Sequence, residues 1–284
     1  MLKNNLQEWL KLSRKEASKG KLPSYIPLLA NADPQAIAIA IQQSNRDRLT
    51  AGNISLTFPL MSVIKPFLLF YLLETQGSDR VFQLVDRLPT SEPFNATPES
   101  KPKNPMINSG AIAISSLLSP CESLQNWLNQ RSLANLTLDL EMLDSVRSVT
   151  NRRNLAIADQ LKSLGIIANP SQALAVYEEI CCLRGNVEDL AKIGTLLVDT
   201  KRSPNISIVL EIMTQCGMYG ASAAFAQDIG LPSKSSVSGA LLSIMTDRAA
   251  IACYSPTLDA IGNSVAGIFL IRQIKNYSLT KAKN

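Results

Sequence analysis

The sequence of 284 residues contains no histidine. This absence excludes a Ser-His-Asp or Cys-His catalytic arrangement and any metal site that depends on an imidazole ligand. An activated nucleophile in this chain must therefore rely on lysine, tyrosine or a carboxylate. No other feature of the composition restricts the possible chemistry as strongly.

Long apolar runs are also absent, and residues 67–73, one of the longest, are far too few for a membrane-spanning helix. Residues 1–21 show neither the apolar core nor the cleavage site of an export signal. The five cysteines form an odd set without Cys-x-x-Cys pairs: Cys121, Cys181, Cys182, Cys216 and Cys253. We therefore expect a soluble, cytoplasmic protein with reduced, buried thiols.

Charge of either sign is sparse, since 18% of the residues are charged and the net charge is +5. No basic block is interleaved with aromatic residues, so we expect neither a nucleic-acid nor a membrane partner. Apolar residues make up 46% of the chain, which is typical of a globular protein. Residues 1–284 are predicted to form a single catalytic domain, because no linker separates two halves.

The apolar pattern predicts strands at both ends of the chain with helices between them. We expect an amphipathic helix over residues 4–19, a β-hairpin over 36–50 and a buried helix over 62–74. A long loop is expected over 87–105 and a helical region over 111–199. Three strands are expected over 237–246, 249–254 and 264–271. The predicted class is α+β: an antiparallel sheet formed by N- and C-terminal strands, flanked by helices, with an inserted helical lobe at about residues 111–200.

Ser62 and Lys65 have the Ser-x-x-Lys spacing, which on a helix places an ammonium one turn from a hydroxyl. Chance produces this spacing easily, and it recurs at Ser18/Lys21, Ser100/Lys103 and Ser278/Lys281. Only Lys65 opens an apolar helix, where burial would lower the lysine pKa. This context makes Ser62 the candidate nucleophile and Lys65 the candidate base.

A second motif follows much later, where Lys234 precedes an apolar strand in the sequence KSSVSG. It is similar to the Lys-Thr/Ser-Gly strand that borders the active site of Ser-x-x-Lys acyltransferases. Taken alone, it is an ordinary exposed turn. Its order after the Ser-x-x-Lys helix and a long loop that carries asparagine makes chance a weaker explanation.

Seven blocks then resemble the glutaminase family of the serine β-lactamase-like superfamily, in the family's order and approximate spacing. They are GKLPSYIP (20–27), SVIK (62–65), NPMINSGAI (104–112), RNLA (153–156), CGMY (216–219), GLPSKS (230–235), and SPTLD with GNSV (255–265). The resemblance covers nearly the whole chain, and residues 104–112 are its most specific part.

The resemblance implies that Ser62 attacks the side-chain amide of glutamine, that Lys65 accepts its proton, and that ammonia leaves from an acyl-enzyme. It also implies Tyr219 as a proton shuttle and backbone N–H groups of Ser62 and Val237 as the oxyanion hole. The family positions that bind substrate correspond to Tyr25, Asn108, Asn154, Tyr177, Tyr219 and Val237. No metal and no organic cofactor is implied, and the expected assembly is a homo-oligomer such as a homotetramer.

Two binding positions depart from the family pattern. Where similar family members carry a glutamate for the substrate ammonium, this chain has Arg147, and a cation there would repel that group. The residue before the nucleophile, usually glutamine, is Met61. Both changes remove polar contacts to the amino-acid end of glutamine.

Three hypotheses follow from these departures. In the first, the protein is a working glutaminase in which Asp144 or another acid replaces the missing glutamate. In the second, it is an amidohydrolase whose substrate carries a carboxylate that Arg147 would bind. In the third, it is an inactive homologue that binds a ligand, although the retention of Ser62, Lys65 and Tyr219 together argues against this. The first is preferred.

Overall fold

The computed structural model describes residues 2–118, 120–149 and 151–281. Its helices are α1 (Leu2–Ala17), α2 (Pro27–Ala30), α3 (Lys65–Gln76), α4 (Ser78–Leu84), α5 (Asn108–Ser115), α6 (Cys121–Ser132), α7 (Leu140–Val149), α8 (Asn151–Ser163), α9 (Pro170–Cys181), α10 (Val187–Gly194), α11 (Pro204–Cys216), α12 (Ser222–Asp228) and α13 (Val265–Lys281), with 3-10 turns η1 (Met61–Ile64), η2 (Thr195–Leu197) and η3 (Tyr219–Ala221). The strands are β1 (Ala38–Gln43), β2 (Arg48–Gly52), β3 (Phe58–Pro59), β4 (Thr137–Leu138), β5 (Leu183–Gly185), β6 (Ser233–Ser235), β7 (Ala240–Met245) and β8 (Ala249–Tyr254).

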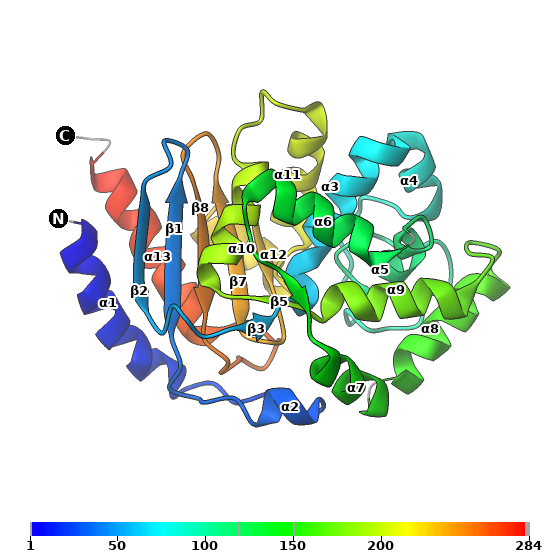
Figure 1. The fold of residues 1–284 in the computed structure, drawn as a ribbon, viewed down its shortest axis with the longest axis horizontal. Coiled ribbons are helices and arrows are strands. Elements are labelled where there is room, and N and C mark those ends of the chain that lie inside the picture. The colour runs from blue at the N-terminus through cyan, green and yellow to red at the C-terminus, as the bar shows by residue number, and fades with distance from the viewer. Residues whose placement is uncertain (1, 119, 150, 282–284) are drawn as a thin grey trace.

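The main sheet has five antiparallel strands in the order β2-β1-β8-β7-β6. The N-terminal hairpin joins the C-terminal strands directly, since Ala38 of β1 lies opposite Tyr254 of β8. Both chain ends therefore lie on the same side of the molecule, beside the sheet (Figure 1). This confirms the predicted α+β class with a sheet built from N- and C-terminal strands.

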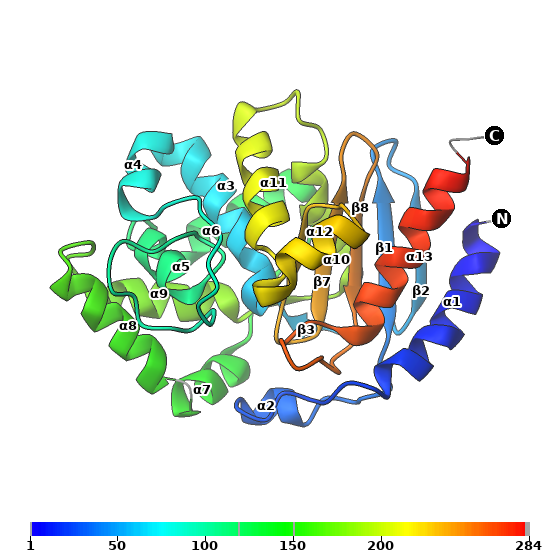
Figure 2. The same cartoon turned by 180° about the vertical axis from the view of Figure 1, so that it is seen from behind.

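Each sheet face buries its own layer because side chains alternate along a strand. On one face, Ile39 and Ile41 pack in a cluster with Leu10 of α1 and Leu270 of α13. Figure 2 shows these two helices side by side over that face. On the other face the strands present small residues, among them Ala40, to the larger core.

Helix α10 covers that second face at very close range. A Cβ added at Gly194 would lie 2.7 Å from the Cβ of Ala250 and 2.8 Å from Cδ1 of Leu242. Small residues on both sides thus allow the helix axis to approach the sheet. Helices α3 to α9 form the helical half of the molecule, away from α1 and α13 (Figure 1). Helix α12 instead lies against α13, where Arg272 pairs with Asp228.

The central element of the helical half is α3, whose residues 65–70, 72 and 73 are all buried. It begins at Lys65 and carries Pro66 in its first turn, where proline costs no hydrogen bond. The buried helix predicted over residues 62–74 is thereby confirmed. No helix or strand is assigned between residues 85 and 107, so the long predicted loop is confirmed as well.

One predicted strand is wrong: the segment Ser264–Ile271 is not extended but lies almost wholly in α13. Its apolar run is as short as a buried strand, and periodicity alone does not separate the two cases. The buried residues Ala266, Leu270 and Ile274 recur every four positions, which is a helical spacing. These three residues face the sheet. The edges of the sheet are formed by β2 and β6, and this segment packs on the face of the sheet and adds no strand to it.

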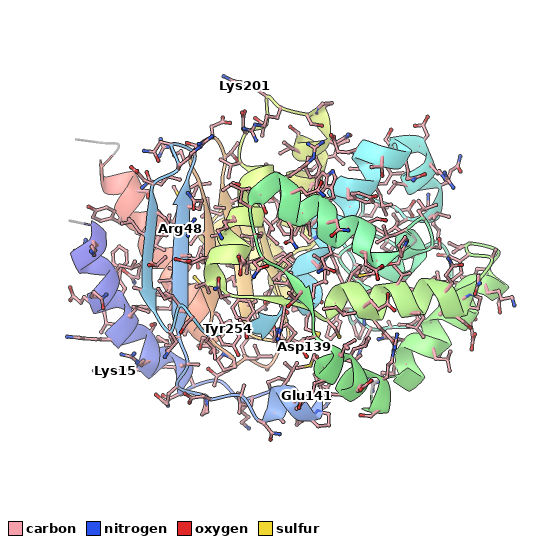
Figure 3. The ribbon with its side chains drawn as sticks, in the orientation of Figure 1. Lys15, Arg48, Asp139, Glu141, Lys201 and Tyr254 are labelled. Atoms are coloured by element: carbon pink, nitrogen blue, oxygen red, sulfur yellow. The ribbon has the colours of Figure 1, made fainter. Side chains whose placement is uncertain are left out.

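Most of the described charged residues are distributed over the surface, as the mixed sequence pattern indicated, whereas Lys65, Glu178, Asp189 and Lys234 are buried. Figure 3 shows Lys15 and Lys201 projecting from widely separated edges of the molecule. All five cysteines are buried and free, which confirms the predicted burial of the thiols. Within residues 2–118, 120–149 and 151–281, no helix combines the length and apolar character needed to cross a membrane.

Replacing Gly217 by alanine should destabilise the fold, because the new Cβ would lie 1.8 Å from the backbone oxygen of Ser233. Backbone cannot yield as a side-chain tip can, so β6 would have to move away from the end of α11. We expect a loss of about 3 kcal/mol, which corresponds to a fall in Tm of roughly 6–12 °C.

Gly220→Ala is the matched control, since the nearest atom to its added Cβ is 4.0 Å away. Thermal unfolding of the two variants followed by circular dichroism provides the comparison. Equal Tm values would show that the close contact between α11 and β6 is not needed for stability.

Candidate active site

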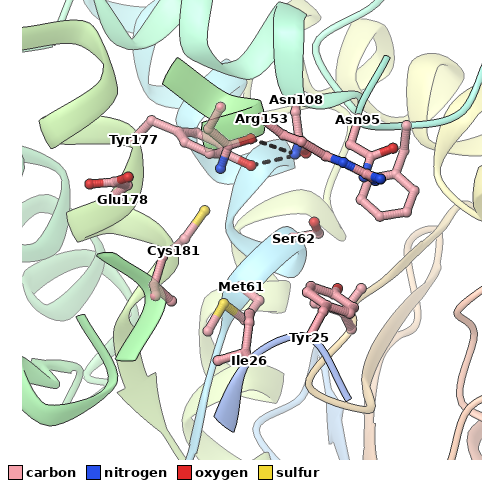
Figure 4. Close-up of a pocket in the computed structure, with 14 residues that line it drawn as sticks. Tyr25, Ile26, Met61, Ser62, Asn95, Asn108, Arg153, Tyr177, Glu178 and Cys181 are labelled. Atoms are coloured by element: carbon pink, nitrogen blue, oxygen red, sulfur yellow. Dashed lines mark hydrogen bonds between the residues drawn. The ribbon is translucent and has the colours of Figure 1, made fainter. Parts of the chain in front are cut away.

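A cavity of about 590 Å³ opens between the main sheet and the helical half. Figure 4 shows Ser62 near its centre, with side chains from several distant segments around it. The lining residues are Tyr25, Ile26, Met61, Ser62, Phe94, Asn95, Asn108, Val146, Arg153, Asn154, Tyr177, Glu178, Cys181 and Val237. The structure thus brings together most of the residues that the sequence singled out.

Ser62 is held at the start of the central helix by a tightly fixed backbone. The preceding residue, Met61, has a φ of +47°, a value that non-glycine residues rarely adopt. Leu60 is anchored on each side, because its N–H donates to Leu183 of β5 and its carbonyl accepts from Ser236. Such local strain persists where the surroundings enforce it, and here it fixes the direction of the Ser62 side chain.

Lys65 lies one turn further on and is completely buried. Its Nζ donates to the carbonyl of Met106 over 3.2 Å and to Oδ1 of Asn108 over 2.8 Å. No carboxylate in the described segments forms an ion pair with it. Burial accordingly lowers the pKa of Lys65 from 10.5 to about 8, because an ammonium is poorly solvated there.

Asn108 connects this lysine to the substrate-binding positions predicted from the sequence. Its Oδ1 also accepts a hydrogen bond from the Tyr177 hydroxyl over 3.0 Å, and its Nδ2 donates to Oδ1 of Asn154 over 3.1 Å. One side chain therefore orients three others. Its own place depends on Gly110, where any Cβ would lie 2.0 Å from the carbonyl oxygen of Asn104.

Tyr219 approaches Ser62 from the other side, and its φ of +53° is also unusual. Its hydroxyl donates to the carbonyl of Ser235 over 3.2 Å and shares a hydrogen bond with Ser62. Since the phenol has a single proton, it accepts from Ser62. Burial raises the pKa of Tyr219 above its usual value, and the contact with Ser62 opposes that shift. Phe94 packs against its ring, with the centroids 4.9 Å apart.

Lys234 is a second fully buried lysine beside this tyrosine. Its Nζ donates to the carbonyls of Gly217 and Ser235 over 3.1 Å and 2.7 Å and lies 4.4 Å from the centroid of the Tyr219 ring. Burial and then the charge of Lys65 lower its pKa well below the usual value. The motif that looked like an exposed turn is therefore a buried strand at the edge of the site.

The remaining predicted residues lie at the cavity wall. Val237 follows β6 and is buried, whereas Tyr25 is exposed at 42%. Met61 also lines the cavity, so the position before Ser62 presents a thioether where the family pattern has a glutamine amide. Asn154 is half-buried near the start of α8.

Among the predicted binding positions in the described segments, Tyr219 is not a lining residue, although it shares a hydrogen bond with Ser62. Arg147 does not line the cavity either. Its guanidinium is directed to helix α9, where Nε lies 3.1 Å from Oε2 of Glu178 and one Nη lies 3.7 Å from Oε1 of Glu179. Asp144, the acid considered as a replacement, is exposed and is not a lining residue either. The positive charge at position 147 is therefore balanced by acids and does not face Ser62.

Sequence reasoning missed Glu178 and Cys181 as lining residues. Both belong to α9, which begins at Pro170 and has Asn169 as its N-cap residue. The spacing of Leu174, Tyr177, Glu178 and Cys181 is i, i+3, i+4, i+7, so the signal was available: a charged residue lies on the apolar face of this helix. Glu178 is in fact only 3% exposed.

The antiparallel sheet, its helical layers and a Ser-x-x-Lys motif opening a buried central helix define the serine β-lactamase-like fold. In the described segments, no group of acidic or thiol side chains is arranged to hold a metal ion. The chain belongs to the glutaminase family, whose model matches residues 20–280.

Individual relatives are similar over almost their full length. A glutaminase of Synechocystis sp. is 37% identical over 289 residues, which cover 96% of this chain and 88% of that protein. Glutaminase 2 of Bacillus subtilis is 36% identical over 292 residues, or 94% of each. The structure of the Bacillus subtilis glutaminase YbgJ in a covalent complex with 5-oxo-L-norleucine has a TM-score of 0.87, with 25% identity over 98% of both chains.

The Lys65 side chain should titrate with a midpoint near pH 8, far below the 10.5 of a free lysine. In protein labelled with ¹³C at the lysine ε carbon, one resonance should move through this midpoint and be missing from Lys65→Met. Asn108→Asp would place a carboxylate beside the ammonium and should raise the midpoint. A Lys65 resonance that titrates near its ordinary pKa would contradict the buried, unpaired amine described above.

Proposed function

We propose that the protein hydrolyses the side-chain amide of L-glutamine to L-glutamate and ammonia through a Ser62 acyl-enzyme. The observation that carries this proposal is the buried amine of Lys65, held by two carbonyl oxygens one turn from a serine that faces the cavity. The glutaminase relatives support the choice of substrate.

The two acceptors around Lys65 match the neutral form of its amine. A neutral –NH₂ group has two N–H donors, which Met106 and Asn108 receive, and one lone pair that remains to accept the Ser62 proton. The Ser62 oxygen then bonds to the amide carbon, and the negative charge that forms on the amide oxygen is stabilised by the backbone N–H groups of Ser62 and Val237.

Collapse of this intermediate breaks the C–N bond, and the departing nitrogen needs a proton to leave as ammonia. Tyr219, which accepts a hydrogen bond from Ser62, passes the proton from Lys65 to that nitrogen. Water next attacks the ester, and Lys65 takes its proton. Breakage of the bond to Ser62 returns that proton to the serine and releases glutamate. The buried Lys234 holds the Tyr219 ring and the Ser235 carbonyl in place.

The cavity wall favours glutamine over a substrate that needs Arg147. That arginine is paired with two glutamates and does not itself line the cavity, which argues against the anionic-substrate hypothesis. The cation on the wall is instead Arg153, which suits the α-carboxylate that glutamine itself carries. Asn108, Asn154, Tyr177 and Tyr25 supply further polar contacts.

The same proposal includes the wider expectations about the protein. Residues 1–284 would act as a single domain, without a metal or organic cofactor, in the cytoplasm. A homo-oligomer such as a homotetramer is supported by the family resemblance alone.

Wild-type protein should release ammonia from L-glutamine, and Ser62→Ala should release none above the blank. The covalent glutamine analogue 6-diazo-5-oxo-L-norleucine tests the nucleophile independently of turnover, because mass spectrometry should find one 5-oxo-norleucine adduct on a peptide containing Ser62. An adduct elsewhere, or equal ammonia release by both proteins, would sink the proposed mechanism.

The rate should depend on pH with the sign set by Lys65. The base acts in its neutral form, so kcat/KM should rise about tenfold per pH unit below the Lys65 pKa of about 8 and level off above it. Initial rates at low glutamine concentration between about pH 6 and pH 9 measure this profile. A kcat/KM that is constant over this range would rule out Lys65 as the base.

A further inference from the structure

Glu178 is an acid that no step of the proposed mechanism uses, although it lines the cavity. It follows Tyr177 on α9 and lies one helical turn before the end of the lining segment at Cys181. Figure 4 shows it at one edge of the lining residues, beyond Tyr177 and Cys181 as seen from Ser62. It is therefore placed to meet the end of a substrate that is remote from the reacting amide.

One of its two carboxylate oxygens is unsatisfied. Oε2 accepts from Arg147 over 3.1 Å, whereas Oε1 is buried and has no hydrogen-bond partner within the described segments. A buried acceptor left in this state costs free energy, and more so when it is charged. The terminal torsion of glutamate is broad, and Glu178 lines the cavity, so rotation of the carboxylate is the motion by which Oε1 would reach a ligand there.

The net charge of the groups around Glu178 would be balanced by one more cation. Arg147 faces two carboxylates, those of Glu178 and Glu179, so this group of three carries a net negative charge when all are ionised. Burial raises the pKa of Glu178, and the hydrogen bond and charge of Arg147 oppose this shift. Arg147 thus favours the ionised form of Glu178 without neutralising the whole group.

We propose that Glu178 binds the α-ammonium of the substrate through Oε1 and that Arg147 is its positioning residue. This inference rests on the proposed function and makes it more specific: the substrates are amides with a free amino group at the far end. The carboxylate of Glu178, held by the guanidinium of Arg147, would thus bind the substrate ammonium in place of the glutamate that similar family members carry at position 147.

The test compares Glu178→Gln with Glu179→Gln, a control on the same helix that also removes a carboxylate near Arg147 but lies outside the cavity lining. Each is assayed with L-glutamine and with 4-carbamoylbutanoate, which has the same amide and no amino group. Glutamine at position 178 keeps the shape and an acceptor for Arg147, so the fold should be retained.

For Glu178→Gln we expect kcat/KM for L-glutamine to fall about 10- to 100-fold, mainly through KM, while the value for 4-carbamoylbutanoate changes little. Glu179→Gln should leave the preference between the two substrates as in wild type. Equal losses on both substrates would indicate a structural effect and overturn the proposal, as would an unchanged preference in Glu178→Gln.

Binding to Ser62→Ala separates this inference from the proposed function. Calorimetry with L-glutamine on Ser62→Ala, with and without Glu178→Gln, needs no turnover and should show the same fold-weakening. If wild type proves inactive while this ammonium-dependent binding persists, the proposed hydrolysis fails and the role of Glu178 stands. If glutamine binds equally with and without Glu178→Gln, or does not bind, the role of Glu178 is overturned.

The variant Arg147→Glu tests whether residue 147 positions Glu178 or itself contacts the substrate ammonium. It removes the partner of Glu178 and adds a third acid nearby, so kcat/KM for L-glutamine should fall by a similar factor. The loss on 4-carbamoylbutanoate should be smaller. A rise in glutamine hydrolysis would instead mean that position 147 itself faces the ammonium, and the assignment of Glu178 would be overturned.

Discussion

An amine buried without a counter-ion among the residues that the structure describes is the constraint on which the rest of this structure depends. Lys65 is fully enclosed, yet its hydrogen-bond partners are carbonyl oxygens and not carboxylates. Carbonyl groups satisfy the N–H donors of the amine but do not hold a positive charge as strongly as an acid would. The site therefore favours the neutral form of the amine, whereas an ion pair at the same place would have held the proton on the lysine.

Several elements together enclose this amine. The loop before α5 brings the Met106 carbonyl to it, and α5 itself starts at Asn108. Helix α9 closes one side with Tyr177, whose ring centroid is 5.7 Å from Nζ. Lys234 repeats the same arrangement from the sheet, again with two carbonyl acceptors. Two ammonium groups so placed disfavour each other, which adds to the effect of burial.

The sequence was sufficient for the class of fold, since strand patterns at both ends and helical periods between them are local signals. It failed at residues 264–271, where a short apolar run is compatible with both a strand and a buried helix and only the position against the sheet decides. Ser62 and Lys65 were singled out as candidate nucleophile and base from their spacing and apolar context, and the structure places Ser62 at the cavity wall and Lys65 one turn further on, fully buried. The direction of Arg147 was not predictable, because it depends on Glu178, which is distant in sequence and adjacent only after α7 and α9 have packed.

The pairing of β1 with β8 has a consequence for how the protein is made. Residue 38 meets residue 254, so most of the chain must leave the ribosome before the sheet can form. Ser62 and Lys65 are synthesised early, but Lys234, Ser235 and Val237 come from strand β6 and the loop after it, and they reach the site only when β7 and β8 are in place. A nascent chain thus carries the serine and its lysine in an environment where the lysine is solvated and protonated. The site is therefore complete only when assembly of the sheet is nearly finished, and the topology of the sheet sets that timing.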